Sequence, residues 1–466
     1  MPKACVPDSF ATERSGWTAF APLRLLRAGL DTVIGYGWWV RTEVASQLSA
    51  ARRYEHPRPR HVLLLASSLP PAVNGGVFRP MSFLKYGAEL GWTMTAIAGG
   101  LRHVHEKAGA ELLATLPQDV IIHRIRPKIQ PSWRLFPQIE GGAVNALAMV
   151  SLARRLFDGY LPTIVLASGP SFYSFVAGCY LARFFDAKLV LDYRDEWTEC
   201  PFDFVSTGVV DRLMERRILS RADAVIFTTN SHRQHQLAVF PQLSEGKCHV
   251  IPNGWEPNAI YGGQAETPRT AKRSGEIMIS YVGNLGPYTR PGKFLTSLAR
   301  LLERGDDLRQ QVKLRFVGNV LPAERSVLNA FPFQDRIEIL DHVPRPEAVR
   351  YMRESDLLLI LAEPELARYR PGKLYDYLAA GPPVLVCGHR GEASDLVERL
   401  GAGVFVPEGD EGALWQLLDD LCKGMDILPA RSPEIDAWLQ RHTREHLAGE
   451  LFEILEQLIE GADAVS

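Results

Sequence analysis

The sequence predicts an α/β protein made of two parallel, doubly wound sheets that face each other across a cleft. Short apolar runs of strand length alternate with helical patterns in both halves of the chain, which is typical of parallel sheets covered by helices. A polar, glycine-rich segment at residues 261–275 separates the halves and predicts a linker. Charged residues follow several apolar runs, at the strand ends where such sheets bind ligands.

The composition is that of an ordinary globular protein. At 466 residues the chain is long enough for two domains, and its 46% hydrophobic and 23% charged residues are typical values. A formal net charge of -2 argues against a nucleic-acid-binding protein. The six cysteines are scattered without a C-x-x-C pair, so we expect reduced thiols and neither a disulfide framework nor a zinc site.

Residues 1–60 are predicted to form a basic amphipathic extension. They contain nine lysines and arginines against five acidic residues, with leucines at helical spacing before Trp38 and Trp39. One interpretation is a peripheral membrane contact through residues 20–45; packing of this helix on the first domain is the alternative. No stretch is long and apolar enough to span a bilayer, and no secretory signal begins the chain. We therefore expect a cytoplasmic protein. If residues 20–45 contact a membrane, the expected surface is the inner face of the plasma membrane.

The first half opens with a strand followed by a glycine pair, Gly75 and Gly76, and a helix expected at residues 77–90. Glycines at this position let the backbone approach a ligand, although a plain turn is the alternative. Arg79, on the first turn of the helix, can reach an anion. The strands of this half are expected at residues 61–68, 93–99, 120–126, 163–168, 188–197, 222–229 and 249–254.

The segment DYRDEW ends one of these strands. Asp192, Arg194 and Asp195 stand where the chain leaves the sheet, and carboxylates there can orient an acceptor hydroxyl or take its proton. The alternative is a salt-bridged loop in which Arg194 neutralises both acids.

The second half repeats the design. After its first strand, a loop with Arg290 and Lys293 leads into a helix expected at residues 291–304, which predicts either an anion site or a solvated basic loop. The strands are expected at residues 276–284, 312–319, 336–343, 356–362, 384–387 and 402–407. A last helical pattern, residues 435–459, is long enough to cross back to the first domain.

The segment YRPGKLYDYLAAGPPVLVCG, at residues 369–388, predicts a loop, a short helix, a tight turn and a buried strand. The helix start offers unpaired backbone N–H groups, with Arg370 and Lys373 beside them, which suits a phosphate or diphosphate. Asp376, one turn further on, can accept hydrogen bonds from sugar or ribose hydroxyls. The alternative is an ordinary βα unit with charges on its solvated face.

Four segments resemble one enzyme family. They are similar to segments of GT-B glycosyltransferases, and most similar to retaining family 4, group 1. LLLASSLPPAVNGG resembles that family's opening loop, and DYRDEW resembles its D-x-R-D-x-W element. YVGNLGPYTRPGKF resembles the start of its donor domain, and RPGKLYDYLAAGPPVLV resembles its P-x-K-x-x-E-Y-x-A-x-G-x-P-V signature. The resemblance begins after the extension at 1–60. It implies a Rossmann-like acceptor domain at 61–260, a Rossmann-like nucleotide-sugar donor domain at 276–432, and a helix at 433–466 that crosses back.

The resemblance also implies roles for single residues. Asp195 would orient the acceptor, with Asp192 and Arg194 on the acceptor side, and Arg290 and Lys293 would neutralise the donor diphosphate. No metal and no cofactor is implied, since basic residues and backbone N–H groups stabilise the leaving group. The implied donor-binding residues are Gly75, Gly76, Gly283, Asn284, Arg370, Gly372, Lys373 and Asp376.

Some positions depart from the family pattern. Of the usual E-x7-E pair, Asp376 replaces the second glutamate and Arg368 stands at the first, although Glu363 and Glu365 are nearby. Asn284 stands where an arginine often follows the strand. Because of these changes, the resemblance does not identify the donor sugar.

The expected function is transfer of a hexose or related sugar from a nucleoside-diphosphate sugar to an acceptor hydroxyl, with retention. The expected acceptor is a lipid-linked or surface-polysaccharide precursor. Two alternatives remain: a nucleotide-sugar 2-epimerase of the same fold, and a non-catalytic nucleotide-sugar-binding subunit. A dehydrogenase lacks support because no G-x-G-x-x-G follows the first strand.

Overall fold

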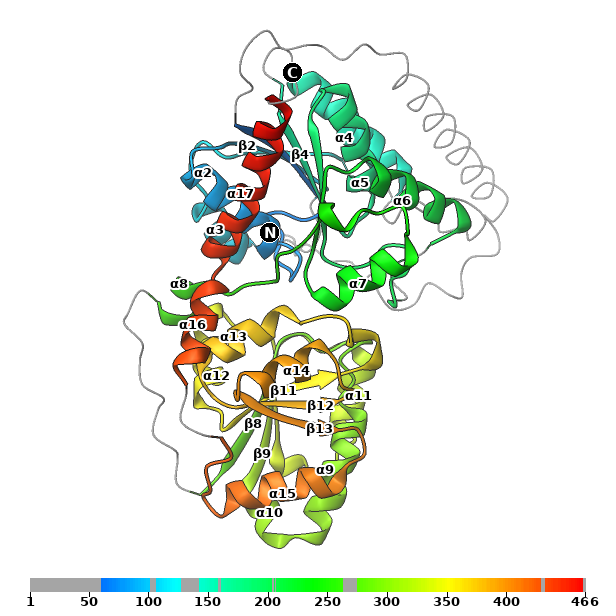
Figure 1. Cartoon of the computed structure of the whole chain (residues 1–466). Coiled ribbons are helices and arrows are strands. Elements are labelled where there is room, and N and C mark those ends of the chain that lie inside the picture. The colour runs from blue at the N-terminus through cyan, green and yellow to red at the C-terminus, as the bar shows by residue number, and fades with distance from the viewer. Residues whose placement is uncertain are drawn as a thin grey trace, which may run out of the picture.

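The structure is a computed structural model that describes residues 60–100, 106–126, 142–157, 161–202, 205, 207–262, 275–428 and 432–463. The predicted amphipathic extension, apart from its last residue, lies outside these ranges, as does most of the predicted linker. The described residues form two α/β domains stacked one above the other (Figure 1).

The first domain is built on a parallel sheet with the strand order β3-β2-β1-β4-β5-β6-β7. Its central strands are continuous apolar runs because helices cover both faces; Leu63, Leu64 and Val165 are fully buried. The strands are β1 (His61–Ala66), β2 (Thr93–Ala98), β3 (Ile121–Arg124), β4 (Ile164–Gly169), β5 (Lys188–Tyr193), β6 (Ala224–Phe227) and β7 (Cys248–Val250).

Helices pack on both faces of this sheet, so the domain has two apolar layers. One layer contains residues of α4, α5 and α6, and the other contains residues of α2 and of the last helix of the chain, α17. The helices are α2 (Phe78–Glu89), α3 (Glu106–Ala114), α4 (Ala143–Leu156), α5 (Tyr173–Phe184), α6 (Val209–Arg221), α7 (Asn230–Val239), η1 (Glu245–Lys247) and α8 (Pro257–Tyr261).

The second domain has the parallel strand order β10-β9-β8-β11-β12-β13. Here too the central strands are buried on both faces; Leu358 and Leu385 are fully buried. The strands are β8 (Ile277–Val282), β9 (Val312–Val317), β10 (Ile337–Leu340), β11 (Leu357–Ala362), β12 (Val384–Gly388) and β13 (Gly403–Pro407).

The helices of the second domain also form two layers. Residues of α9, α10, α11 and α15 pack on one face, and residues of α12, α13, α14 and α16 pack on the other. The helices are α9 (Gly292–Arg304), α10 (Asp306–Gln311), α11 (Pro322–Asn329), η2 (Gln334–Arg336), α12 (Arg345–Glu354), η3 (Pro364–Leu366), α13 (Gly372–Ala380), α14 (Glu392–Arg399), α15 (Glu411–Cys422), α16 (Pro433–Arg441) and α17 (Arg444–Asp463).

The predicted fold class is confirmed, and a strand lies at each predicted position. Most strands are shorter than predicted, and the difference matters most for β5, which ends at Tyr193, not at residue 197. Its pairing with β6 stops at Tyr193 and Phe227, and the residues that follow turn toward the second domain, where Glu196 contacts Arg368.

The single C-terminal helix predicted at residues 435–459 is wrong, because the chain forms α16 and α17 with a break between them. At the break, Thr443 lies beside Trp255 in a short parallel bridge, and the Arg444 N–H donates to the Trp255 carbonyl at 2.9 Å. Trp255 also donates its indole N–H to the Leu439 carbonyl at 2.8 Å. The two connections between the domains therefore run side by side and form one hinge.

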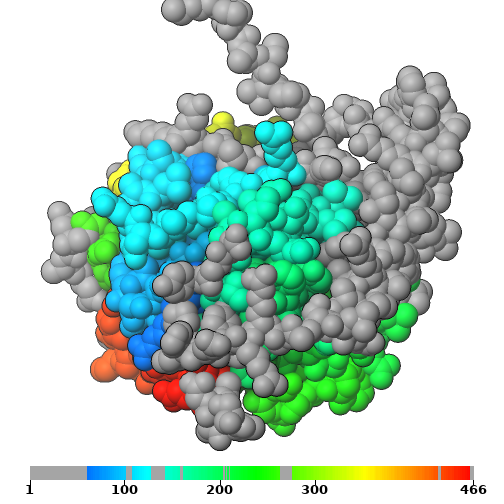
Figure 2. All heavy atoms as spheres, turned by 90° about the horizontal axis from the view of Figure 1, so that it is seen from above, coloured from blue at the N-terminus to red at the C-terminus, as the bar shows by residue number. Residues whose placement is uncertain are grey.

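Helix α17 belongs to the core of the first domain. Its Phe452 ring lies 5.3 Å from that of Trp92, and both residues are buried. Figure 2, seen from above, shows the red atoms of this helix beside the blue atoms of the domain's first elements. No helix in the described part of the chain is long and apolar enough to span a bilayer.

Candidate active site

The candidate site of the second domain lies where its strand order reverses. Strands β8 and β11 are neighbours, but the chain continues outward from them in opposite directions. In open parallel sheets ligands bind beyond the carboxyl ends of two such strands. The loop with Gly283 follows β8, and η3, Pro371 and helix α13 follow β11.

Lys373 is the central side chain at this point. Its ammonium nitrogen lies 3.6 Å from the ring centroid of Tyr281 on β8 and is buried, with no hydrogen-bond partner among the described residues. Burial lowers the pKa of this lysine to about 7. Gly283 makes room for the lysine, since a Cβ there would lie 2.7 Å from Nζ, and its φ of 143° favours glycine.

The start of helix α13 lies beside this lysine. The residue before the helix is Pro371, and no side chain caps the helix start by a hydrogen bond. A Cβ on Gly372 would meet nothing within 4 Å. An uncapped helix start carries partial positive charge and N–H donors, so together with Lys373 it forms a site for an anion.

Asp376 is buried and paired. Its Oδ1 lies 2.6 Å from Nη2 of Arg345, the first residue of α12, whose side chain is 39% exposed. A ribose hydroxyl could reach Asp376 only beside or in place of this guanidinium. Arg345 is not among the residues predicted from the sequence. It follows β10 at the same edge of the sheet, and that position could have indicated it.

The two basic residues expected to neutralise a diphosphate are held by acids. Arg290 Nη2 lies 2.7 Å from Glu363 and 3.2 Å from Glu365, and Lys293 Nζ lies 2.6 Å from Glu408. The Arg290 side chain is 47% exposed and the Lys293 side chain is 65% exposed. Their role at a diphosphate stays a prediction. Asn284, another expected donor residue, is exposed, and its carbonyl accepts a hydrogen bond from Tyr281.

Arg370 contacts the first domain through a carboxylate. Its Nη2 lies 2.5 Å from Glu392 on α14, and Glu392 also accepts hydrogen bonds from the N–H and hydroxyl of Ser231. Burial would raise the pKa of Glu392, but the Ser231 hydrogen bonds and the Arg370 charge together lower it. The carboxylate is therefore ionised and holds Arg370 in place.

In the first domain, Asp192 is not on the acceptor side. It is fully buried and accepts hydrogen bonds from Arg79 Nε and Nη2, at 2.9 and 2.8 Å, and from the Ser168 hydroxyl at 2.8 Å. This part of the prediction is wrong, because no face of the carboxylate is left for an acceptor. Arg79 does reach an anion, as predicted, but the anion is this aspartate.

Arg194 contacts backbone carbonyls. Its Nη1 lies 2.5 Å from the Gly76 carbonyl, and Nη2 lies 3.3 Å from that of Pro170. A Cβ on Gly76 would lie 2.8 Å from Nη1, whereas one on Gly75 would meet nothing within 4 Å. The alternative that Arg194 neutralises both acids is therefore wrong: it braces the loops after β1 and β4.

Asp195 remains the available carboxylate. It is partly exposed, and among the described residues its carboxylate interacts with neighbouring charges and has no hydrogen bond. Burial raises its pKa, the Arg194 charge lowers it, and the charges of Glu196 and Asp192 raise it further. A carboxylate with raised pKa and unused oxygens suits contact with a hydroxyl.

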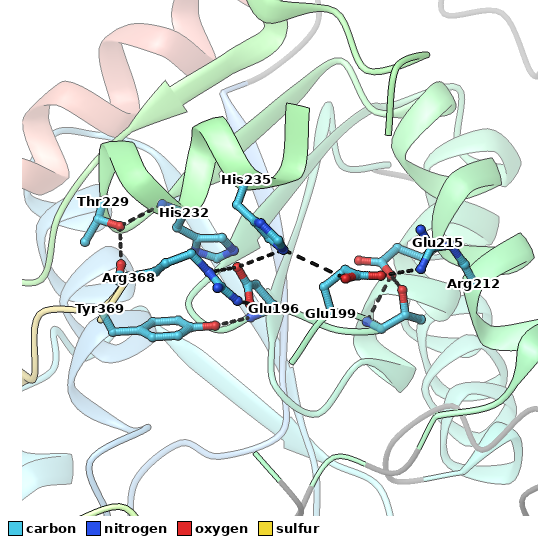
Figure 3. Close-up of polar contacts among 10 residues, drawn as sticks. Glu196, Glu199, Arg212, Glu215, Thr229, His232, His235, Arg368 and Tyr369 are labelled. Carbon is cyan, nitrogen blue, oxygen red and sulfur yellow. Dashed lines mark hydrogen bonds and ion pairs between the residues drawn. The ribbon is translucent and has the colours of Figure 1, made fainter. Parts of the chain in front are cut away.

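The segment after β5 and the loop before α13 meet across the domain boundary (Figure 3). The Glu196 N–H donates to the Tyr369 hydroxyl at 3.3 Å. Burial raises the pKa of Tyr369 and the charges of Glu196 and Asp195 add to the increase, so Asp195 lies close to the loop that leads to Lys373. No group of His, Cys, Asp or Glu in the described part of the chain is arranged to hold a metal ion.

Two sequence families match this chain. The glycosyl transferase 4-like domain matches residues 74–254, and the glycosyl transferases group 1 match residues 276–423. Together the two ranges take up more than half of the chain. No curated protein is similar to the chain in sequence.

Solved structures share the fold at low identity. Sucrose-phosphate synthase from Thermosynechococcus elongatus is 15% identical, with a TM-score of 0.62 over 86% of this chain and 99% of that one. An α,α-trehalose-phosphate synthase (UDP-forming) from Burkholderia vietnamiensis is 14% identical, with a TM-score of 0.62 over 88% and 99%. A protein of Listeria monocytogenes assigned as a UDP-N-acetylglucosamine 2-epimerase is 12% identical, with a TM-score of 0.52 over 86% and 97%.

The family matches fall on the two domains in chain order, and the structural likeness extends over both of them. The chain belongs to the GT-B glycosyltransferases, with a glycosyl transferase 4-like first domain and a group 1 second domain.

Proposed function

We propose that this glycosyltransferase moves a hexose or related sugar from a nucleoside-diphosphate sugar to an acceptor hydroxyl, with retention and without a metal ion. The observation that carries the proposal is the buried ammonium of Lys373, which has no hydrogen-bond partner in the described part of the chain and lies beside the uncapped start of α13. In such a transfer negative charge develops on the departing diphosphate. Prearranged positive groups at that position stabilise the transition state more than the ground state.

The geometry supports further roles within this proposal. The diphosphate would lie against Lys373 and Gly372, with the nucleoside toward Asp376 and Arg345. Asp195, with its unused oxygens, would accept a hydrogen bond from the acceptor hydroxyl. Asp192 and Arg194 would act only by holding the strand end and the glycine loop in place.

The proposed acceptor is a lipid-linked or surface-polysaccharide precursor, met at the cytoplasmic face of the membrane. It is supported by the basic amphipathic pattern of residues 20–45 and by the kind of acceptor that is usual in the family. Deleting residues 1–55 should move the protein from the membrane fraction to the soluble fraction while nucleotide binding persists. Unchanged partitioning would count against the membrane contact.

The donor test is thermal unfolding with a panel of UDP-, GDP-, ADP- and TDP-sugars, with and without EDTA. A ligand at about 100 times its Kd adds roughly 2.7 kcal/mol to the unfolding free energy. We expect one nucleotide family to shift the melting temperature, with no effect of EDTA and no shift in Lys373→Ala. Lys313→Ala is the matched control. Lys313 is the second residue of β9, near the amino ends of the strands and so away from the candidate site, and it pairs with Glu276.

A nucleotide-sugar 2-epimerase is the second candidate, favoured by the structural likeness to the Listeria protein. An epimerase converts the donor alone, whereas a transferase needs an acceptor, so product analysis with donor alone separates them. A non-catalytic subunit would bind the nucleotide and show no turnover with any acceptor, and neither Lys373→Ala nor Asp195→Asn would then change a rate.

A further inference from the structure

The loop before helix α13 is held by the first domain. Arg368 stands at the position of the first glutamate of the family's E-x7-E pair, five residues before Lys373. Its guanidinium forms a two-point contact with Glu196, with Nε–Oε1 at 2.8 Å and Nη2–Oε2 at 2.5 Å (Figure 3). Glu196 is fully buried and the Arg368 side chain is 33% exposed. Two-point pairs of this kind fix orientation as well as distance.

The backbone of the same loop is tied to the first domain as well. The Thr229 hydroxyl donates to the Arg368 carbonyl at 2.6 Å and also caps α7 by accepting from the His232 N–H at 3.1 Å. The Glu196 N–H donates to the Tyr369 hydroxyl. The loop is therefore held through one side-chain pair, one carbonyl and one hydroxyl, in addition to the connection from Arg370 through Glu392 to Ser231.

Tyr369 is seated among rings of the first domain. Its ring centroid lies 5.4 Å from Phe202 and 5.7 Å from His232. Neither ring nitrogen of His232 has a hydrogen-bond partner among the described residues, and burial lowers its pKa to about 3. His232 is therefore neutral and acts as a packing surface for the tyrosine. We call the contacts of Glu196, Thr229 and His232 with Arg368 and Tyr369 the latch.

The latch lies away from the hinge. The hinge at Trp255 and Thr443 connects α8 with α16 and α17, and Figure 1 shows α8 and α16 at one side of the domain boundary and α7 at the other. The hinge keeps the domains joined without the latch. A buried ion pair adds little net stability, because desolvation offsets its Coulomb energy, so its stronger effect is on geometry.

We infer that Glu196 is a positioning residue: through Arg368 it fixes the loop 368–371 against the segment 195–197 and thereby sets the separation between Asp195 and Lys373. Glu196 directly follows Asp195, and Arg368 lies in the loop that leads into the first turn of α13, where Lys373 is. Position 368, where the family pattern has a glutamate, thus carries an arginine that pairs with a carboxylate of the other domain. The inference rests on the proposed function for its catalytic consequence only.

The kinetic test compares Glu196→Gln, Arg368→Gln and the double variant with the full-length wild type. A misplacement of about 1 Å between reacting groups can cost about 100-fold in rate. We expect each single variant to lose about that much in kcat while the Kd for the nucleoside diphosphate is nearly unchanged. The double variant should be no worse than either single one, because the pair acts as a unit. Additive losses, or losses in Kd alone, would overturn the inference.

A second readout needs no turnover. Small-angle scattering of the ligand-free protein should show a larger radius of gyration for Glu196→Gln and Arg368→Gln than for wild type. Arg325→Gln, which removes an exposed pair with Asp341, should leave it unchanged. An unchanged radius in the latch variants would refute the latch whatever the activity. If the radius of gyration increases in the latch variants but the wild type binds no nucleotide, the proposed function is refuted. The latch then holds the two domains together without a catalytic role.

Discussion

The ammonium nitrogen of Lys373 lies 3.6 Å from the ring centroid of Tyr281, in a position where no described residue offers it a hydrogen bond. A cation–π contact contributes about 0.5–2 kcal/mol. This is not enough to compensate burial, because the pKa of the lysine falls from 10.5 to about 7. The site therefore keeps a destabilised cation at the reversal point of the sheet, which is expected where an anionic ligand completes the pairing.

Replacing Lys373 by methionine should stabilise the ligand-free protein. The unfolded chain binds the lysine proton up to about pH 10.5 and the folded chain only up to about pH 7, so wild-type stability rises with pH between these values. The advantage of Lys373→Met should be largest below pH 7 and shrink toward pH 10. Thermal unfolding at pH 6 and pH 9 measures it, with about 2–4 °C expected per kcal/mol. A lower melting temperature at both pH values would contradict the destabilised cation.

Nucleotide binding should take up protons. An anionic diphosphate favours the charged form of Lys373 and raises its pKa above about 7, so affinity should decline as the pH rises through the raised value. Titration calorimetry at pH 8 in buffers of different ionisation enthalpy measures the protons taken up. Lys373→Arg, which stays charged, should bind without proton uptake; equal uptake in that variant would assign the proton to another group.

Gly283→Ala should weaken nucleotide binding by displacing the lysine. The new Cβ would lie 2.7 Å from Nζ, and a φ of 143° is strained for alanine, so we also expect a loss of stability of about 1 kcal/mol or more. The control is Gly449→Ala in helix α17, where a Cβ meets nothing within 4 Å and helix propensity should add up to about 1 kcal/mol. Unchanged binding in Gly283→Ala would show that the lysine does not depend on that space.

Asp192 and Asp195 should give opposite phenotypes. Asp192→Ala leaves Arg79 buried without its partner, and breaking a buried pair costs about 3–5 kcal/mol. Asp195→Asn removes a carboxylate whose raised pKa disfavours its charge, so stability should hold or rise at neutral pH while transfer is lost. Chemical unfolding and transfer rates of both variants check this. A stable Asp192→Ala protein, or an active Asp195→Asn enzyme, would reverse the assignment.

The fold was predictable from the sequence because buried parallel strands are continuous apolar runs, and each such run became a strand. The break between α16 and α17 was not, since it depends on pairing of Thr443 with Trp255, almost two hundred residues earlier. The position of Lys373 at a helix start could be predicted from the sequence. Its burial could not, because burial depends on the strand order, which places Tyr281 and Gly283 beside the lysine.

The same limit explains the errors at the site. Asp192 and Asp195 are three residues apart at one strand end, and only the sheet register shows that the first points into the core, toward Arg79. Arg345 and Glu196 contribute through ion pairs with residues distant in sequence, and no local pattern indicates such pairs. The ion pairs of Arg290 and Lys293 with Glu363 and Glu408 were missed for the same reason.

Whether Lys373 binds the diphosphate is tested by titration calorimetry on wild type and Lys373→Ala, in which a nucleoside diphosphate is compared with the monophosphate of the same base. Hydrogen bonds to charged groups contribute about 1.5–3 kcal/mol, so wild type should prefer the diphosphate by roughly 10- to 150-fold. In Lys373→Ala this preference should fall to the contribution of the helix start alone, about 2- to 5-fold, while monophosphate affinity persists. An undiminished preference in Lys373→Ala would contradict the account, because the diphosphate would then bind elsewhere.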